Sequence, residues 1–182
     1  IDRLAASTHL ALTAYAVDSA TGALTVANTT LAGTTAASVS VRPDGRFAYV
    51  ANRDADALSI VSVNPTSGTL TTLGAVGAGN RPEAIGIDPK GRFAYAANNS
   101  GPSVSAYTIN SGNGVLVSAG AISTGTNPTD VVVDPSGRFV YVVNSATNQL
   151  SHYSILTVPN GSLTFVSSVP TGTTPLKVSA DP

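Results

Sequence analysis

The sequence predicts an all-β protein, a β-propeller of about four blades, each a four-stranded antiparallel sheet of about 46 residues. Three observations predict this fold. One phrase occurs three times at a spacing of 46 residues, as residues 42–52 (RPDGRFAYVAN), 88–98 (DPKGRFAYAAN) and 134–144 (DPSGRFVYVVN). Short apolar runs separated by Gly, Pro, Asn and Ser turns fill the space between the phrases, and no helical periodicity of useful length appears. Both faces of the expected strands carry apolar side chains, so neighbouring sheets must cover each sheet on both sides.

Each repeat is expected to hold four strands. The first, residues 84–87 in one copy, is short and apolar and ends at Asp-Pro. A tight turn follows, in which Pro presets φ and Gly supplies the positive φ that the turn needs, and it leads to the second strand, residues 93–97. A polar turn from Asn98 precedes the third strand, residues 104–109. An Asn/Pro/Ser/Gly turn precedes the fourth, such as residues 70–76 in the preceding copy.

The chain is expected to form one domain over residues 1–182, which is single-domain length. The approximate repeats are residues 1–36, 37–82, 83–128 and 129–175. Residues 176–182 are expected to form the first strand of a closing blade, for which the N-terminal repeat supplies the other three strands. Propeller rings commonly close in this way, because closure removes exposed sheet edges.

Composition and charge exclude several functional classes. The net charge is −1 and no Lys/Arg cluster exists, so there is no electrostatic footprint for nucleic-acid binding. No run of 18 apolar residues is present, so we expect no membrane span. Cysteine is absent, which excludes disulfides, cysteine-containing zinc sites and thiol catalysis, and no cofactor is expected.

The composition also indicates where the protein acts. Only 10% of the residues are charged, and Thr, Ser and Asn are abundant, which favours a bacterial secreted, periplasmic or cell-surface protein. Methionine is absent, also at position 1, so we expect a sequence that begins after processing or is a fragment.

Charged residues that break the repeat stand where the first strands begin. In a propeller these strands converge at the mouth of the central channel, where ligands usually bind. The residues are Arg81, Glu83, Asp130 and Lys177. We predict that they bind a small-molecule or glycan ligand, with Glu83 and Asp130 as candidate catalytic carboxylates. The alternative is that the four side chains pair with one another or face water.

Two other groups of residues favour a structural interpretation over a metal site. His9 and His152 occupy non-equivalent places in their repeats and have no neighbouring ligand set, so we expect no metal there. Asp54 and Asp56 form a D-x-D pattern that suits Ca²⁺, but no further ligand pattern follows, and a turn is favoured.

Residues that recur in every repeat are expected to serve the blade rather than a ligand. Asparagine is expected to tolerate left-handed φ and to bond to nearby backbone at the strand end. Arginine is expected to brace the turn against Asp88, Asp134 or a neighbouring blade. The recurring residues are Asn52, Asn98 and Asn144, and Arg46, Arg92 and Arg138.

The repeated phrase carries a family resemblance. Pro-x-Gly-Arg-Phe-x-Tyr-Val-x-Asn resembles the YVTN β-propeller repeat of bacterial and archaeal surface proteins, and it is similar to the lactonase-like seven-bladed propellers related to 6-phosphogluconolactonase. With its flanks the resemblance covers most of residues 10–182. For the lactonase-like members it implies a Pro-Arg-His step that supplies a functional Arg and His. This chain departs from that step, because residues 82–84, 128–130 and 175–177 read Pro-Glu-Ala, Pro-Thr-Asp and Pro-Leu-Lys.

Three ring arrangements stay open at this point. In the first, which the resemblance implies, the chain is a piece of a seven-bladed protein. In the second, two chains pair into an eight-bladed ring, and in the third, one chain closes as a four-bladed ring. An open half-ring exposes two apolar blade faces, so we expect self-association through them.

We therefore expect a secreted or surface propeller that acts as a binding or scaffold module. The alternative is a sugar-lactone hydrolase of the lactonase-like type. The missing Pro-Arg-His step and the low content of acid and base residues favour the binding module.

Overall fold

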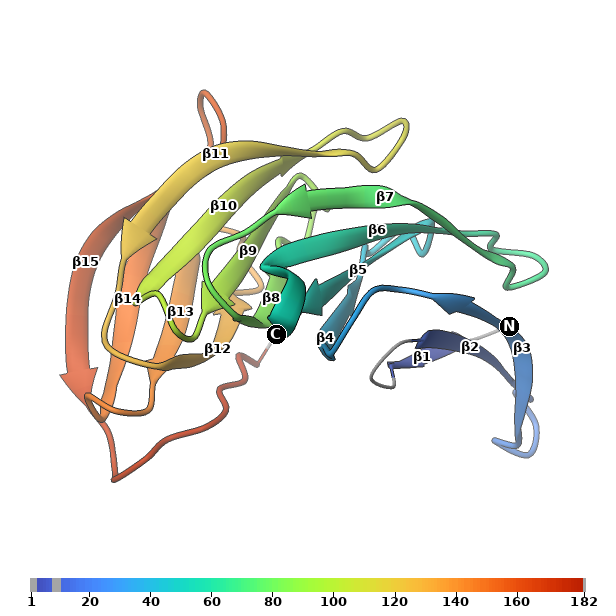
Figure 1. The fold of residues 1–182 in the computed structure, drawn as a ribbon, viewed down its shortest axis with the longest axis horizontal. Coiled ribbons are helices and arrows are strands. Elements are labelled where there is room, and N and C mark those ends of the chain that lie inside the picture. Colours follow the sequence, from blue (N-terminus) through green and yellow to red (C-terminus); the bar gives the residue numbers. More distant parts are fainter. Residues whose placement is uncertain (1–2, 8–10, 182) are drawn as a thin grey trace.

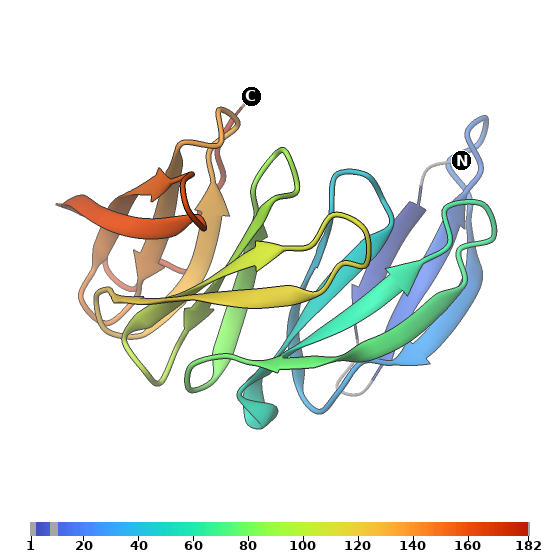
Figure 2. The ribbon, with the colours of Figure 1, turned by 90° about the horizontal axis from the view of Figure 1, so that it is seen from above.

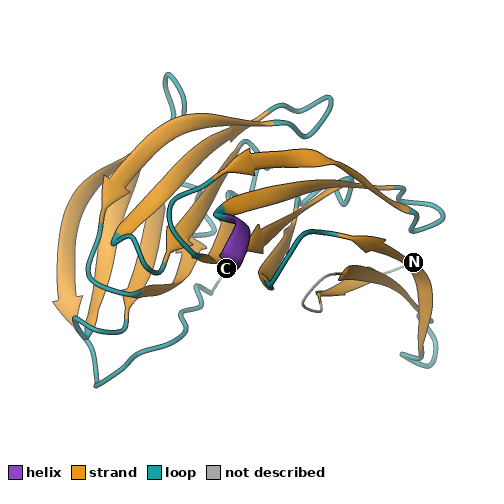
Figure 3. Cartoon of the chain, viewed as in Figure 1, coloured by secondary structure: helices purple, strands orange, loops and turns teal. Residues whose placement is uncertain are grey.

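The computed structural model describes residues 3–7 and 11–181, and in that part of the chain it is almost entirely β-sheet (Figures 1 and 3). The elements are β1 (Arg3–Ser7), β2 (Ala11–Val17), β3 (Leu24–Leu31), β4 (Ala36–Val41), β5 (Phe47–Asn52), the 3₁₀ turn η1 (Arg53–Ala55), β6 (Ala57–Val63), β7 (Leu70–Gly77), β8 (Pro82–Ile87), β9 (Phe93–Asn98), β10 (Ser103–Ile109), β11 (Leu116–Ser123), β12 (Pro128–Val133), β13 (Phe139–Asn144), β14 (Gln149–Leu156) and β15 (Ser162–Pro170). Among these residues no helix is long and apolar enough to cross a membrane.

The strands form four antiparallel sheets in chain order, which we number as blades. Blade 1 holds β1–β3, blade 2 β4–β7, blade 3 β8–β11 and blade 4 β12–β15. The sheets fan out around one side, where the inner strands β4, β8 and β12 gather, and the outer strands lie on the convex side (Figures 1 and 2). The expected propeller blades are confirmed, and they form an open arc with blades 1 and 4 at its two ends.

The inner strands lie directly side by side from blade to blade. Ser40 Oγ donates a hydrogen bond to the carbonyl of Ile85 at 3.0 Å, which joins β4 to β8. A Cβ at Gly86 would lie 3.0 Å from the carbonyl oxygen of Val131, so β8 approaches β12 closely enough to favour a glycine. Small residues on the inner strands therefore set how tightly the blades converge.

Blades 2 and 3 each pack on the following blade through an aromatic pair on the second strand. Phe47 and Phe93 lie against the glycines of the following blade's outer turn, and these glycines have positive φ. Tyr49 Oη donates to the carbonyl of Gly114 at 2.9 Å, and Tyr95 Oη donates to that of Gly161 at 2.8 Å. The cores of the molecule thus lie between blades, which is why the second strands are apolar on both faces.

The recurring asparagines are structural, as expected. The expected bonds to nearby backbone are confirmed at Asn52 and Asn144, whose Nδ2 atoms donate to the carbonyls of Val50 and Val142 at 3.3 and 3.2 Å, whereas the expected left-handed φ is wrong. Asn52 ends β5 with an extended backbone, φ −105°, so left-handed φ is not what favours asparagine there. Its side chain is buried and donates from Nδ2 to Ser59 Oγ at 2.8 Å. Asn98 and Asn144 make the same bond to the serines two residues into the next strand. Each asparagine therefore ties the second strand to the third from inside the blade.

The recurring arginines divide into two kinds of contact. Arg92 pairs with the buried Asp88, with Nη2 and Oδ2 2.9 Å apart, and its guanidinium lies 4.9 Å from the centre of the Phe93 ring. The guanidinium groups of Arg46 and Arg138 also lie over the rings of the next residues, at 5.6 and 5.1 Å. The expected brace against an aspartate is confirmed for Arg92, whereas the cation–π contact is shared by all three.

The expected closing strand does not form in this structure. Residues 171–181 are described and contain no strand, although residues 176–182 were expected to begin a closing blade. A strand needs a hydrogen-bonding partner, and its expected partner β1 lies at the far end of the arc (Figure 1). The first blade accordingly has three strands, in the order β1-β2-β3.

Two buried tyrosines are expected to lower the stability of the fold at alkaline pH. Burial raises the pKa of Tyr49 to about 12 and also raises the pKa of Tyr95. In the unfolded chain the tyrosine hydroxyl has a pKa near 10. The raised pKa in the folded state therefore makes the free energy of unfolding depend on pH: this contribution is fully present below about pH 10 and is lost as the pH rises toward 12. We expect Tyr49 to contribute a fall of about 1.4 kcal/mol in unfolding free energy per pH unit in that window. Urea unfolding at pH 9 and pH 11 measures it. Tyr49→Phe is expected to reduce the slope, and an unchanged slope would contradict this account.

Candidate functional site at the inner ends of the blades

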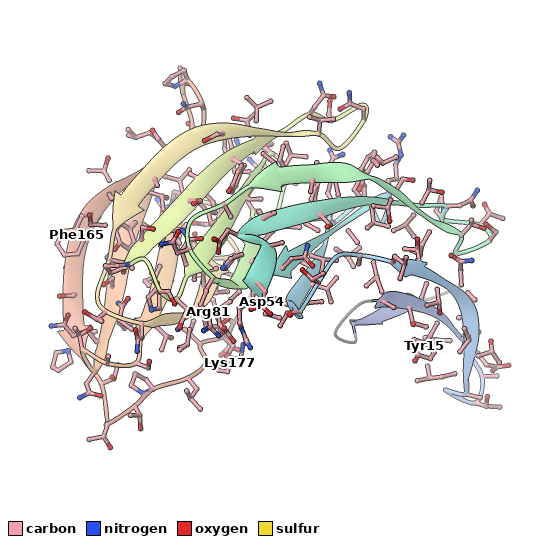
Figure 4. The ribbon with its side chains drawn as sticks, viewed as in Figure 1. Tyr15, Asp54, Arg81, Phe165 and Lys177 are labelled. Atoms are coloured by element: carbon pink, nitrogen blue, oxygen red, sulfur yellow. The ribbon has the colours of Figure 1, made fainter. Side chains whose placement is uncertain are left out.

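The four predicted site residues all lie where the arc converges. Arg81 and Glu83 flank the start of β8, Asp130 lies near the start of β12, and Lys177 belongs to the segment that follows blade 4. Figure 4 shows Arg81, Lys177 and also Asp54 at this inner end of the fan. The topology therefore brings together residues that stand up to 96 positions apart in the sequence, from 81 to 177.

Glu83 is held by an arginine of the preceding blade. Arg53, in η1, donates from Nε to Glu83 Oε2 at 2.8 Å and from Nη2 to the other carboxylate oxygen. Both side chains are partly buried, with relative exposures of 30% and 25%. A bidentate pair of this kind uses both carboxylate oxygens and fixes their direction. Glu83 thus joins blade 2 to blade 3, and it is poorly placed to accept a proton from water.

Asp130 and Lys177 form a looser pair. Their charged atoms lie 3.6 Å apart, and the lysine side chain is 75% exposed, whereas that of Asp130 is 15% exposed. Asp130 Oδ2 also accepts a hydrogen bond from the backbone of Val178 at 3.0 Å. An exposed ion pair contributes little to stability, so separating Lys177 from Asp130 costs little free energy.

Arg81 is the predicted residue that the fold leaves available. Its side chain is exposed, and its guanidinium has no hydrogen-bond or ion-pair partner among residues 3–7 and 11–181. Its backbone has positive φ, 54°, and its amide donates to Asp56 Oδ1 at 2.7 Å. The equivalent residues Thr35, Asn127 and Thr174 have positive φ too, so this backbone is a property of the repeat. Position 81 differs from these three in having a charged side chain.

The four predicted residues therefore differ in their ion-pair partners. Asp130 pairs with Lys177, as the alternative interpretation expected, whereas Glu83 pairs with a residue outside the predicted set, and Arg81 is unpaired. Sequence analysis missed Arg53 as the partner of Glu83 and Asp54 as a member of the cluster. Both are charged residues at positions that are uncharged in the next repeat, where Asn99 and Ser100 stand. A search for charges that differ between repeats, which selected Arg81, therefore also selects Arg53 and Asp54.

The D-x-D turn makes structural bonds. Asp54 Oδ2 accepts the hydroxyl of Thr35, and Asp56 binds the Arg81 amide, so each carboxylate fastens η1 to the start of an inner strand. Within residues 3–7 and 11–181 no group of three or more His, Asp or Glu side chains is placed to hold a metal ion. His152 stacks on Tyr141 with ring centres 5.0 Å apart and is remote from this cluster in the repeat, while His9 lies outside the described residues.

Comparison with protein families decides the wider assignment. The family described as "Lactonase, 7-bladed beta-propeller" matches residues 10–131 and again residues 75–180, which together span nearly the whole chain. The chain belongs to this lactonase family. A search of curated proteins found no match.

Solved structures share the fold of this chain. A protein from Lactobacillus plantarum is similar at 25% identity and a TM-score of 0.83, with 95% of this chain and 53% of that chain covered. A putative 6-phosphogluconolactonase from Bacteroides uniformis has a TM-score of 0.82 at 20% identity, covering 98% and 60%. The periplasmic gluconolactonase PpgL of Pseudomonas aeruginosa has a TM-score of 0.76 at 19% identity, covering 92% and 53%.

The chain spans a little more than half the length of the structures that it matches. Its membership of the family favours the hydrolase alternative over the binding or scaffold module that the sequence analysis preferred. The Pro-Arg-His step is nevertheless absent from the blades present here. The charged cluster around Arg81 lies at the starts of the inner strands, beside residues 82–84 and 128–130.

Proposed function

We propose that this chain contributes the ligand-binding end of a propeller that hydrolyses a sugar lactone. The observation that carries the proposal is the family match over residues 10–180, together with relatives whose names identify them as gluconolactonase or putative 6-phosphogluconolactonase. The charged cluster at the inner ends of the blades supports it, because this is where side chains from several blades meet around one ligand.

Lactone hydrolysis sets specific chemical requirements. The oxygen of a water molecule bonds to the ring carbonyl carbon, the carbon–oxygen bond of the ring breaks, and the ring oxygen leaves as a hydroxyl group after gaining a proton. The site must take one proton from the water and stabilise the negative charge that develops on the carbonyl oxygen. The product is an open-chain hydroxy acid, which is anionic at neutral pH.

The residues divide these tasks according to their partners. Asp130 takes the proton from water, because Lys177 holds it only at 3.6 Å and that lysine is exposed. Arg81 binds the anionic part of the substrate, since its guanidinium is unpaired and exposed. Glu83 is a positioning residue whose pair with Arg53 holds blades 2 and 3 in register.

The test is hydrolysis of glucono-δ-lactone and of its 6-phosphate, followed in a pH-stat above the spontaneous rate. Asp130→Asn is expected to lower kcat by about 10²-fold or more on both lactones, the usual effect of losing a general base. Arg81→Ala is expected to raise KM about 10-fold to 100-fold for the phosphorylated lactone, with a smaller change for the other.

Arg46→Ala is the matched control, because Arg46 is also an exposed arginine but lies in the turn at the opposite end of its strand pair. It is expected to leave both constants unchanged. Hydrolysis of neither lactone above the spontaneous rate contradicts the proposed function, and a rate that Asp130→Asn leaves intact contradicts the assigned base.

A further inference from the structure

A cavity of about 80 Å³ lies between blades 3 and 4, on the convex side of the arc. Its walls come from β10 and β11 of blade 3 and from the start of β15 of blade 4, and these strands lie next to one another (Figure 1). Val104 and Ala106 at its floor are buried, whereas Gly120 at its rim is exposed, so the cavity opens to solvent. None of the residues that line it is charged. Such a space suits a small neutral molecule.

The neighbouring blade contacts show why a space is left here. In each blade one residue of the third strand faces the bulge of the outer strand, and the equivalent pairs are Ala14 with Asn28, Ile60 with Gly74, and Ala106 with Gly120. Between blades 2 and 3, the Ile60 side chain is buried in one cluster with Leu116 of the next blade. Between blades 1 and 2, the Asn28 side chain reaches across to the next blade. Blade 3 combines the smallest residue of each kind, alanine and glycine, and the cavity results.

The amide of Leu163 is a hydrogen-bond donor in the wall of this cavity. Its strand partner Ile155 donates its own amide to the carbonyl of Arg138, on the side away from β15, so the Leu163 amide points away from β14. Leu70 is the equivalent residue of blade 2, and its amide donates to Asn28 Oδ1 at 3.0 Å. The glycine at that place in blade 3 has no side chain to accept the bond, so the donor in blade 4 is left for a ligand.

Ser162 adds a hydroxyl to the lining, next to Leu163. Its Oγ has no hydrogen-bond partner among residues 3–7 and 11–181. A matching ligand therefore needs an apolar end for the floor, an acceptor for the Leu163 amide and a donor for the Ser162 hydroxyl.

Acetamide has these three parts in a molecule of suitable size. The cavity has the volume of about three water molecules at ~30 Å³ each, and about half the ~150 Å³ of an apolar cavity that binds benzene. A molecule of four non-hydrogen atoms, with a methyl group, a carbonyl oxygen and an amide nitrogen, is of this size. It is also the chemical group at the end of the Asn28 side chain, which bridges blades 1 and 2.

We propose that this cavity binds an acetamide group, either as a small free amide or as the acetamido group of a larger molecule that enters past Gly120. The methyl group lies on Val104, Ala106 and Ile122, the carbonyl oxygen accepts the Leu163 amide, and the nitrogen donates to Ser162 Oγ. The ligand thereby makes the bridge between blades 3 and 4 that Asn28 makes between blades 1 and 2. The site is formed by outer strands, away from the charged cluster at the inner ends, so binding here does not depend on lactone hydrolysis.

The test is a titration of the nitrogen-15-labelled chain with acetamide, followed by NMR. We expect a saturable shift of the Leu163 amide signal with a Kd in the millimolar range, because so small a ligand has few contacts to make. Acetate has the same shape and a charge, and is expected to bind at least about 10-fold more weakly, since the lining holds no cation.

N-acetylglucosamine, titrated in parallel, distinguishes the two sources of the group. A shift of the Leu163 amide at lower concentrations than with acetamide supports the acetamido group of a larger molecule as the ligand. A shift with acetamide alone supports a free small amide. Glucose, which lacks the acetamido group, is the control and is expected to leave this amide signal unchanged.

Two variants test the site itself. Ala106→Ile gives blade 3 the residue that Ile60 provides in blade 2, and is expected to weaken acetamide binding at least about 10-fold while the spectrum stays that of a folded protein. Ser162→Ala removes one hydrogen bond and is expected to weaken binding about 2-fold to 10-fold. Ala75→Ile is the matched control, because it makes the same substitution at an exposed alanine of β7, outside the cavity, and it is expected to leave binding unchanged.

Xenon, titrated as an apolar probe, separates an amide site from a merely apolar cavity. A response to xenon without any shift of the Leu163 amide by acetamide or N-acetylglucosamine overturns the proposal. So does acetamide binding that both Ala106→Ile and Ser162→Ala leave intact, because the ligand then lies elsewhere.

Discussion

Gly161→Ala is expected to destabilise the protein by about 2–5 kcal/mol, because it combines two penalties at one position. The residue has φ +77°, a region that costs a residue with a Cβ about 1–2 kcal/mol. The new Cβ would also lie 2.2 Å from Cδ1 of Phe93, a buried ring between the guanidinium of Arg92 and the turn. Either the ring or the turn must move, and the Tyr95 hydrogen bond to the Gly161 carbonyl moves with it. Urea unfolding at one fixed protein concentration measures the loss.

Gly45→Ala separates the two penalties. Gly45 has φ +70°, but nothing lies within 4 Å of the place where its Cβ would be, so only the backbone term applies. It is expected to cost about 1–2 kcal/mol. If the two alanine variants lose the same stability, the packing of Phe93 on the outer turn of the next blade is not what holds blades 3 and 4 together.

Asn98→Ala is expected to destabilise the protein by about 2–4 kcal/mol. The side chain is 0% exposed, its Nδ2 donates to Ser103 Oγ and Ser105 Oγ at 3.1 and 3.0 Å, and its Oδ1 accepts the amide of Gly79 at 3.2 Å. Alanine leaves a cavity and removes a hydrogen-bond partner from three buried or half-buried groups. Thermal or urea unfolding of the purified variant gives the value.

Asn99→Ala is the control for this change. Asn99 is the next residue and is half-buried, and its side chain donates from Nδ2 to the carbonyl of Pro128 at 3.2 Å, its one side-chain hydrogen bond among the described residues. It is expected to cost about 0.5–1.5 kcal/mol, the usual net value of one hydrogen bond. A larger loss for Asn99→Ala than for Asn98→Ala would place the important bond between the blades and not within the blade.

Much of the fold is readable from the sequence because the same local problem recurs in each repeat. The spacing of Phe47, Phe93 and Phe139 predicts the second strand of three blades, and β5, β9 and β13 begin at these residues. The position of the candidate site is readable for the same reason, since charges that break a repeat stand out against it. Arg81 at the inner end of blade 3 is one of these charges.

What a side chain contacts depends on residues far away in the sequence, and this was less predictable. Glu83 pairs with Arg53 because one blade's turn lies over the start of the next blade's inner strand, a distance of 30 residues. The asparagine at the end of β5 is buried against Ser59, and its extended backbone shows that its environment, not its φ, selects it. Only the assembled sheets reveal either fact.

The sequence by itself determined the unit of this protein: a four-stranded blade with apolar faces on both sides, repeated every 46 residues. Period, turn residues and strand patterning are local properties, and local physics is enough to predict them. Only the tertiary structure decided that the blades form an open arc and that Asp130 and Glu83 have different partners. The reason is that these features depend on the angle between neighbouring blades. That angle results from the packing of rings on glycines across each interface, which no single repeat contains.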